Sequence, residues 1–499
     1  MNELVTAIPQ ATRDRNPLIG EEGWLLLQSL VDHPDAPHWT RNVGDRIGAD
    51  DLRAVDWFRR QLPGSRQWSA HGPTPTITRW ATDMIASTAF HRSRIRDGVN
   101  PARSWVDLPA MDRHDLVTRM AEIVPDSAPL DELVVVRTAG ITGEPLELPH
   151  HPRAIVADHP LLEATLAEHE ITLETGPDVV AVANIGAEAD PDIFAAVFAA
   201  WDDAAMVNVN LRPADWRTGI DGARRFFSDL EAQVITGEPA ALLEARAWEL
   251  DIRPAAVVTT GSALRTGTAT RLREYFGCPV IDWYSLAEAG PVAGSAADGP
   301  GLRLLSGDLY VEIIDTHGRP GRPGTFGEIA LTGGRNPYLP LVRYRTGDFG
   351  RLERVNGEPR LLDLRGRSPV LFRTGDGLPI HPREVGKALR NAALFVRHQV
   401  VQEEDGSVGA AIEPAEGMPV NWEALHRSLK GLFGDVRIAV ESDTELGGAQ
   451  PFRSEMSALD DADEPLSAPR DLDPGEVLVD SDIAGHTEDP LADDVPHDL

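Results

Sequence analysis

Short apolar runs rich in β-branched residues alternate with longer stretches rich in Ala, Leu, Glu and Arg between residues 130 and 260. The short runs predict buried strands, and the longer stretches predict helices. Strands are expected at 133–136, 179–183, 234–235 and 255–259, and helices at 154–169, 193–201 and 239–249. This alternation is typical of a largely parallel sheet that helices cover on both faces.

The pattern changes after residue 307, where apolar runs are separated by Gly and Pro turns. Runs at 309–314, 327–331 and 348–352 predict hairpin strands of a β-barrel-like subdomain. Beyond residue 366 we expect a smaller α+β unit, with helices at 382–393 and 421–432 and strands near 395–401, 408–412 and 436–440. Upstream, residues 78–96 predict a helix and residues 112–120 a capped helix.

These patterns predict an α/β fold class with four regions. They are an N-terminal extension of unclear role (1–75), a large N-terminal domain of mostly parallel sheets with the β-barrel-like subdomain (76–365), a mobile small α+β C-terminal domain (366–455) and a disordered acidic tail (456–499). A hinge is expected near residues 364–369. The tail is expected to be disordered because about fifteen Asp and Glu follow Ser454, with one Arg and no Phe, Tyr or Trp.

Composition narrows the classes of partner. The chain has 79 acidic and 47 basic residues, a net charge of -32, which repels phosphate backbones and argues against nucleic acid. No window approaches the roughly 18 to 20 apolar residues of a membrane span, and no targeting signal is evident, so we expect a cytoplasmic protein without a membrane partner. Cys278 is the only cysteine, which excludes internal disulfides. Lys387 and Lys430 are the only lysines, so a lysine-dependent mechanism has two candidates.

A Thr- and Gly-rich turn follows the strand predicted at 133–136. Residues 138–145 read TAGITGEP, and such a turn offers backbone N–H groups and hydroxyls to a phosphate oxygen. A hairpin turn without a ligand explains this stretch equally well.

Two further motifs supply an aromatic ring and two carboxylates. Residues 282–291 read DWYSLAEAGP, in which Tyr284 can stack on a purine and Glu288 can hold Mg²⁺ beside phosphates. Residues 340–348 read PLVRYRTGD, in which Asp348 is suited to accept hydrogen bonds from ribose hydroxyls. Arg365 and Arg367 match a phosphate near the hinge. The alternative interpretations are that Tyr284 is a core aromatic, Glu288 a helix cap and Asp348 a turn carboxylate. The two arginines would then form an exposed basic turn.

The order of these motifs resembles the adenylate-forming (AMP-binding) superfamily of acyl-CoA synthetases, peptide-synthetase adenylation domains and luciferases. Residues 87–92 (STAFHR), 108–116 (LPAMDRHDL) and 375–385 (GDGLPIHPREV) are similar to segments of its phenylacetate–CoA ligase-like branch. The resemblance covers about residues 80–455.

The resemblance implies ATP and Mg²⁺ as cofactors and assigns roles by position. Tyr284 would stack on adenine, Glu288 would bind Mg²⁺ and phosphate, and Asp348 would hold the ribose hydroxyls. The implied cofactor-binding residues are Thr138, Gly140, Thr142, Gly143, Gly261, Ser262, Tyr284, Ser285, Glu288, Asp348 and Arg367. The implied catalytic residues are Thr142, Glu288, Arg367 and Arg453, and Glu288 is the implied metal ligand.

Three substitutions depart from the family pattern. Glu144 stands where the phosphate loop has Lys, Pro369 where the hinge has a carboxylate, and Gln450 where a C-terminal lysine bridges the substrate carboxylate and the α-phosphate. That lysine stabilises charge developing at phosphorus, and Arg453 is the candidate replacement. Because Pro369 stiffens the pivot and the lysine is lost, the CoA-dependent half-reaction of the family is in doubt.

Three functions are compatible with these features. The first is an ATP-dependent, AMP-forming ligase that adenylates a small aromatic carboxylic acid, with CoA or another acceptor left open. The second is an ATP-dependent diazotase of secondary metabolism, such as antibiotic biosynthesis, that adenylates nitrite and diazotises an aryl amine such as an aminohydroxybenzoate or aminocoumarate. The third is an inactive nucleotide-binding scaffold. A homodimer is also left open.

The walls of the substrate pocket are expected from residues 182–186, 206–210, 234–239 and 259–262. Within these segments the amides of Asn184, Asn208 and Asn210 are candidates for polar recognition in an otherwise apolar pocket. Roles in turns and at strand edges explain the same residues equally well.

Overall fold

The structure is a computed structural model of the chain. It describes residues 7–62, 68–69, 72–95, 99–137, 146–187, 191–315, 317–366, 370, 372–377, 379–380, 382–393, 395–414, 420–442 and 452–454. The expected acidic tail at 456–499 lies outside these residues. Within the described ranges, we find no helix with the length and apolar character needed to cross a bilayer.

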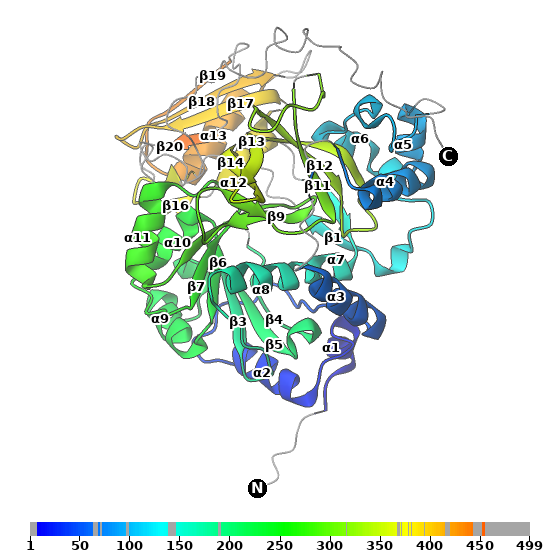
Figure 1. Ribbon diagram of the computed structural model, residues 1–499. Helices are drawn as coiled ribbons and strands as arrows, with labels where there is room; N and C mark the ends of the chain where they lie inside the picture. Colours follow the sequence, from blue (N-terminus) through cyan, green and yellow to red (C-terminus); the bar gives the residue numbers. More distant parts are fainter. Residues whose placement is uncertain are drawn as a thin grey trace, which may run out of the picture.

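The part of the chain before the first strand is mostly helical (Figure 1). Its helices are α1 (Gln10–Arg15), α2 (Glu21–Val31), α3 (Ala49–Gln61), α4 (Pro75–Ser87), α5 (Ala89–Arg94) and α6 (Arg113–Ile123). The helix expected at 78–96 is interrupted at Thr88, whose hydroxyl caps α5 by accepting a hydrogen bond from the His91 N–H. Asp112 caps α6 by accepting from the Asp115 N–H at 3.1 Å, in agreement with the capped helix expected at 112–120.

The main element of the fold is a 12-stranded sheet of order β11-β12-β13-β14-β10-β9-β8-β7-β6-β3-β5-β4. Its parallel part runs from β8 to β5, and β4 pairs antiparallel at the edge. The strands of this part are β3 (Val180–Gly186), β4 (Phe194–Phe198), β5 (Ala204–Asn210), β6 (Val234–Gly237), β7 (Ala256–Thr259) and β8 (Val280–Leu286).

Helices cover both faces of the parallel part, as the alternating pattern predicts. They are α7 (Pro152–Val156) and α8 (Asp158–Glu168) on one face, and α9 (Gly219–Leu230), α10 (Pro239–Ala247) and α11 (Thr266–Phe276) on the other. A short turn of helix, η5 (Pro213–Asp215), precedes α9. The α/β fold class is therefore confirmed.

The hairpin strands after β8 belong to the same sheet. They are β9 (Gly290–Ser295), β10 (Leu302–Leu304), β11 (Leu309–Ile314), β12 (Phe326–Gly333), β13 (Leu341–Val355) and β14 (Glu358–Arg365), and they pair antiparallel. The sheet is therefore mixed, and β8 is the strand at which parallel pairing gives way to antiparallel pairing. The subdomain expected to resemble a barrel continues the central sheet.

The helix expected at 193–201 is wrong. Phe194–Phe198 forms the edge strand β4, and only Ala199–Trp201 forms a turn of 3₁₀ helix, η4. The run is apolar on every side, so its periodicity does not distinguish a buried helix from a buried strand. Helix α2 packs against β4 and β5, which buries the edge of the sheet and leaves β4 no polar face.

Two neighbouring expectations are also modified. The single helix expected at 154–169 is two helices, α7 and α8, because Pro160 lacks the N–H that a continuous helix would use. The strand expected at 133–136 is β1 (Val134–Arg137), but it pairs with β2 (Glu147–His150) in a separate hairpin outside the main sheet. The 3₁₀ turns η2 (Trp105–Asp107) and η3 (Leu130–Glu132) lie in the connection from α5 to β1.

The C-terminal residues have a core of their own. The elements are β15 (Phe372–Arg373), β16 (Pro379–Ile380), α12 (Pro382–Ala392), β17 (Phe395–Gln402), β18 (Val408–Pro414), α13 (Trp422–Phe433), β19 (Ile438–Ser442) and β20 (Phe452–Ser454). Four of these strands form a sheet of order β19-β18-β17-β20. Two ion pairs join this unit to the parallel part: Arg373 to Glu244 at 2.6 Å and Glu384 to Arg212 at 3.4 Å.

Candidate functional site

Strands β8 and β13 bring together two residues that are 64 positions apart, Tyr284 and Asp348. The Tyr284 hydroxyl donates a hydrogen bond of 2.9 Å to Oδ2 of Asp348. Burial, helped by the nearby Asp348 carboxylate, raises the pKa of Tyr284 well above its ordinary value, so the hydroxyl stays a donor. The tyrosine ring packs in the core beneath the antiparallel strands and is 8% exposed.

Glu288 lies in the turn between β8 and β9 and is buried. Its Oε1 accepts a 3.0 Å hydrogen bond from the hydroxyl of Tyr344, a residue of β13, and lies 3.6 Å from Nη1 of Arg113. Burial raises the pKa of Tyr344 far above its usual range, and the Glu288 carboxylate raises it further. The two tyrosine hydroxyls thus hold the two carboxylates of the predicted nucleotide site.

The turn before Asp348 is held by its own hydrogen bonds. Gly347 has a φ of +75°, a left-handed conformation that favours glycine, and its N–H donates to Glu328 at 3.1 Å. The Asp348 N–H donates to the Thr346 hydroxyl at 3.1 Å. The backbone therefore presents Asp348 from a defined turn.

The turn after β7 contains Gly261 and Ser262. Gly261 has a φ of +85°, and a Cβ there would lie 2.9 Å from Cγ of Glu238. The Ser262 hydroxyl is buried and has no hydrogen-bond partner among the described residues. Directly before this turn, Thr260 Oγ1 lies 3.5 Å from the Ser285 hydroxyl of β8, so the turn adjoins the strand that carries Tyr284.

Five of the predicted site residues lie outside the described residues: Thr138, Gly140, Thr142, Gly143 and Arg367. The substituted positions Glu144, Pro369 and Gln450 lie outside them as well. The described neighbours of these residues are nevertheless informative. Arg137 and Glu147 pair across the hairpin that frames the predicted phosphate loop. Gly366 packs against Asp348, because a Cβ on it would lie 3.2 Å from Oδ1.

The remaining cations predicted from the sequence are spread over the C-terminal unit and the hinge. Arg453 lies exposed on the edge strand β20, and Lys387 is exposed on α12. Lys430 of α13 forms an ion pair of 2.8 Å with Asp435. Arg365 stacks its guanidinium over the Phe326 ring, 5.0 Å from the ring centre. The described contacts therefore bring together Tyr284, Glu288 and Asp348, while Arg453 and Arg365 lie on other elements.

A channel of about 670 Å³ lies between the parallel strands and helices α7 and α8, and we call it the α8 channel. Ser285 of β8 and Pro291 of β9 line one end of it. Each of the four segments expected to form the pocket walls contributes a lining side chain, namely Val182, Met206, Thr236 and Thr260.

The predicted asparagines form hydrogen bonds with one another and with neighbouring side chains. Asn184 donates to Asn208 at 2.5 Å and accepts from Thr236 at 2.8 Å. Asn210 donates to Asp215 at 2.6 Å. Among the three amides, the pair Asn184 and Asn208 reaches the channel wall only through Thr236.

Reasoning from the sequence missed three contributors. Tyr344 stands inside the motif that contains Asp348, and Arg113 stands inside the LPAMDRHDL segment, yet neither was assigned a role. Residues 42–46 of the N-terminal extension line the α8 channel, and their composition carries no signal for it. The two motifs could have singled out Tyr344 and Arg113, whereas the role of residues 42–46 depends on the tertiary structure.

One curated protein is similar to part of this sequence, although no family model matches the chain. The chain is 26% identical over 197 residues to a phenylacetate–coenzyme A ligase of Aromatoleum evansii, covering 37% of this chain and 44% of that protein. A crystal structure of 2-hydroxyisobutyryl-CoA ligase with 2-HIB-AMP and CoA matches at 16% identity over 82% of this chain and 91% of the other, with a TM-score of 0.47. A Brucella canis acyl-CoA synthetase matches at 18% identity over 62% and 60%, with a TM-score of 0.34.

The resemblance to the adenylate-forming superfamily, predicted from the motifs, is therefore confirmed at the level of sequence. Within that class, the chain is similar to the phenylacetate–CoA ligases. The match spans less than half the length of this relative.

Proposed function

We propose that the chain is an ATP-dependent, AMP-forming ligase that adenylates an aromatic carboxylic acid. The observation that carries the proposal is the convergence of Tyr284, Glu288 and Asp348 at two hydroxyl–carboxylate contacts, on strands adjoining an apolar channel. The sequence relative is named for the same class of reaction with an aromatic acid.

The reaction proposed is the transfer of an adenylyl group to the acid. A carboxylate oxygen attacks the α-phosphorus, the bond from this phosphorus to the bridging oxygen breaks, and pyrophosphate leaves with the electron pair. The product is a mixed anhydride of the acid and AMP. Asp348, held by Tyr284, is the proposed acceptor of hydrogen bonds from the ribose, and Tyr284 is the proposed neighbour of adenine.

The residues present suit Mg²⁺ bound together with a nucleotide. Oε1 of Glu288 accepts the hydrogen bond from Tyr344, which fixes the carboxylate that would hold the metal. No group of three or more His, Cys, Asp or Glu that would hold a metal occurs in the described part of the chain. Mg²⁺ is commonly bound by one or two carboxylates plus substrate phosphates, and Glu288 is the carboxylate proposed here. When bound, the ion neutralises charge on the phosphate oxygens.

The residues described constrain the acceptor of the activated acid less than they constrain the adenylation step. CoA would require the family's rotation about a hinge that here contains Pro369, so an amine or a carrier thiol is an equally suitable acceptor. Arg453 and Arg367 are the proposed sources of the positive charge that the family's lysine supplies.

The diazotase is the second candidate, and the placement of the lysines favours it. Lys430 is paired with Asp435 and Lys387 lies on α12, so neither stands at the family's lysine position. Nitrite is a small oxyanion without a carboxylate, so it does not need a lysine that bridges a substrate carboxylate and the α-phosphate. In this reaction nitrite would replace the acid as the nucleophile, and an aryl amine would be the acceptor.

A pyrophosphate-release screen separates these functions. The protein with MgATP is tested against aromatic acids with and without CoA, and against nitrite with an aminohydroxybenzoate. We expect release with an aromatic acid, lost at least tenfold in Glu288→Gln and retained in Glu122→Gln, whose exposed carboxylate pairs with Arg119 on α6. A coloured diazo product formed only with nitrite would favour the diazotase. MgATP binding without turnover in any arm would favour the inactive scaffold.

A further inference from the structure

The α8 channel crosses the sheet at right angles to the strands. Side chains from six consecutive strands line it: Ser285 and Trp283 on β8, Val258 on β7 with Thr260 directly after it, Thr236 on β6, Val182 on β3, Met206 on β5, and Phe194 and Phe198 on β4. Neighbouring strands lie about 4.8 Å apart, so the five steps from β8 to β4 span about 24 Å. The channel is therefore much longer than a single-ring acid requires.

The lining of the channel suits a flat aromatic molecule. The lining includes the rings of Trp283, Phe194, Phe198 and Trp201, and His159 stacks on Trp201 with 3.7 Å between ring centres. Burial lowers the pKa of His159 to about 3, so this ring is neutral. The walls thus favour aromatic rings laid end to end.

The N-terminal extension lines the channel near β4, where Asp45 accepts from the Ala199 N–H, and it brings two arginines there, the half-buried Arg15 and the exposed Arg46. Arg15 and Arg46 both line the channel, and the Arg46 N–H donates to the carbonyl oxygen of Arg15 at 2.9 Å. Gly44 permits this close approach, because a Cβ there would lie 2.4 Å from the same oxygen. Arg46 has a φ of +55°, a conformation that non-glycine residues rarely adopt.

Neither guanidinium has a side-chain hydrogen bond or ion pair within the described residues, and they are the only Arg or Lys of the channel lining. Of the two lining carboxylates, Asp45 is hydrogen-bonded to the backbone, whereas the buried Oδ1 of Asp158 has no hydrogen-bond partner within the described residues. Asp45 accepts from the Ile47 and Ala199 N–H groups, and Asp158 lies beside Arg335 near Pro291. Two guanidinium groups at the end of an apolar channel match an anionic group of a ligand.

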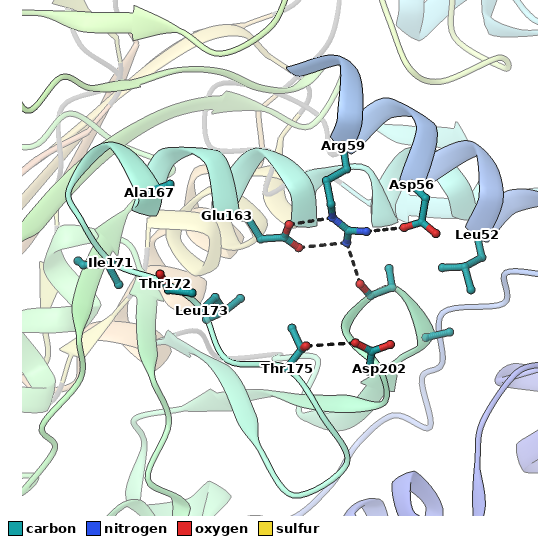
Figure 2. A pocket seen from close by; sticks show the side chains of 12 residues that line it. Leu52, Asp56, Arg59, Glu163, Ala167, Ile171, Thr172, Leu173, Thr175 and Asp202 are labelled. Carbon is teal, nitrogen blue, oxygen red and sulfur yellow. Dashed lines mark hydrogen bonds and ion pairs between the residues drawn. The ribbon is translucent and has the colours of Figure 1, made fainter. Parts of the chain in front are cut away.

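Figure 2 shows the contact between helix α3 of the N-terminal extension and helix α8 of the channel. Arg59 of α3 donates to both carboxylate oxygens of Glu163 on α8, at 2.8 and 3.1 Å, and to the carbonyl oxygen of Ala200 at 2.8 Å. The charged side chains of this pocket bind one another, so we interpret the pocket as the contact between α3 and α8. This contact holds the N-terminal extension against α8, the helix that covers the channel.

We infer that the α8 channel binds an extended aromatic acid with a second anionic group at its far end, which Arg15 and Arg46 recognise. The inference rests on the proposed adenylation, since that reaction places the reacting carboxylate at the β8 end. It also gives the N-terminal extension a role, as the part of the chain that selects the length and the charge of the acid.

The test compares matched acids in pyrophosphate release. The probes are benzoate, p-terphenyl-4-carboxylate and p-quaterphenyl-4-carboxylate, each against its para-dicarboxylate. We expect the quaterphenyl diacid, which is long enough to reach from the β8 end toward the two arginines, to have at least a tenfold lower KM than its monoacid. The Arg15→Gln/Arg46→Gln double variant should remove this preference by raising the KM of the diacid at unchanged kcat. Arg13→Gln, on the exposed side of α1, is the matched control and should change neither value.

Two outcomes would overturn the inference. One is equal KM values for every monoacid and diacid pair in the wild-type protein, and the other is a double variant that retains the preference. If no acid releases pyrophosphate, the proposed function fails, and calorimetry with the same probes then decides the inference by itself. Binding of the diacids to the wild-type protein and not to the double variant supports it, whereas equal binding to both overturns it.

Discussion

Replacing Tyr344 by Phe removes one hydroxyl from the candidate nucleotide site and leaves the ring in place. That hydroxyl donates the 3.0 Å hydrogen bond to Oε1 of Glu288, and both residues are buried. A buried carboxylate that loses a donor is not easily compensated by water. Tyr344→Phe therefore tests whether the orientation of Glu288 matters for the reaction.

The size of the effect follows from the kind of bond. Hydrogen bonds to charged groups contribute about 1.5 to 3 kcal/mol, which corresponds to a loss of about 10- to 150-fold in kcat/KM for ATP. Arg113, 3.6 Å from the same oxygen, remains in place and keeps the loss below that of removing the carboxylate itself. We expect Glu288→Gln to be more severe than Tyr344→Phe for this reason.

The assay is ATP–pyrophosphate exchange with the acid identified in the screen, at varied MgATP. Tyr275→Phe is the control, because its hydroxyl donates to the Leu250 carbonyl oxygen at 2.7 Å, away from the β8 and β13 strands. It should lower the free energy of unfolding by about 1 kcal/mol and leave the kinetics unchanged. A Tyr344→Phe protein that folds and keeps kcat/KM for ATP within twofold of wild type would refute the reasoning.

Two further predictions concern the turn after β7 and the buried carboxylate of β8. Gly261→Ala should cost about 1 to 2 kcal/mol of stability, since its φ of +85° is left-handed and its Cβ would press on Glu238, and it should raise the KM for ATP. Equal urea midpoints for variant and wild type would contradict this. Burial raises the pKa of Asp282 from 3.8 to about 7, so the protonated form contributes stability at acidic pH that is lost as the pH rises through about 7. Asp282→Asn should therefore gain about 2 to 3 kcal/mol relative to wild type between pH 5 and pH 8, and a constant difference in urea unfolding would disprove it.

Most of the strands and helices follow from the local pattern, and the exceptions share a physical cause. Phe194–Phe198 is apolar on both sides because α2 covers the edge of the sheet, and that cover comes from residues more than 160 positions earlier. A segment buried all round lacks the period that separates a strand from a helix. No local feature of residues 193–201 distinguishes the two outcomes.

The candidate site also contains residues that the sequence predicts and residues that only the tertiary structure identifies. Tyr284, Glu288 and Asp348 were found through motif order, which encodes the pairing of distant strands, and the structure joins them. Tyr344 donates a hydrogen bond to Glu288, a residue 56 positions earlier in the chain. The local sequence Arg-Tyr-Arg does not predict this contact. Arg46 lies outside every motif, and its role depends on the contact of Gly44 with Arg15, residues that helix α2 separates in the sequence.

The two ends of the α8 channel are far enough apart to be tested separately. Two unit charges about 24 Å apart interact by about 0.7 kcal/mol at an effective dielectric constant of 20, or roughly threefold in a binding constant, before salt screens them further. Removal of one guanidinium at the Arg46 end should therefore change the KM for ATP by no more than about threefold. The same removal acts on the far anion of a diacid at hydrogen-bond distance, so we expect it to raise the KM of the diacid about tenfold or more. The ratio of these two effects distinguishes recognition of the acid at the far end from a general weakening of the fold, which would change both constants together.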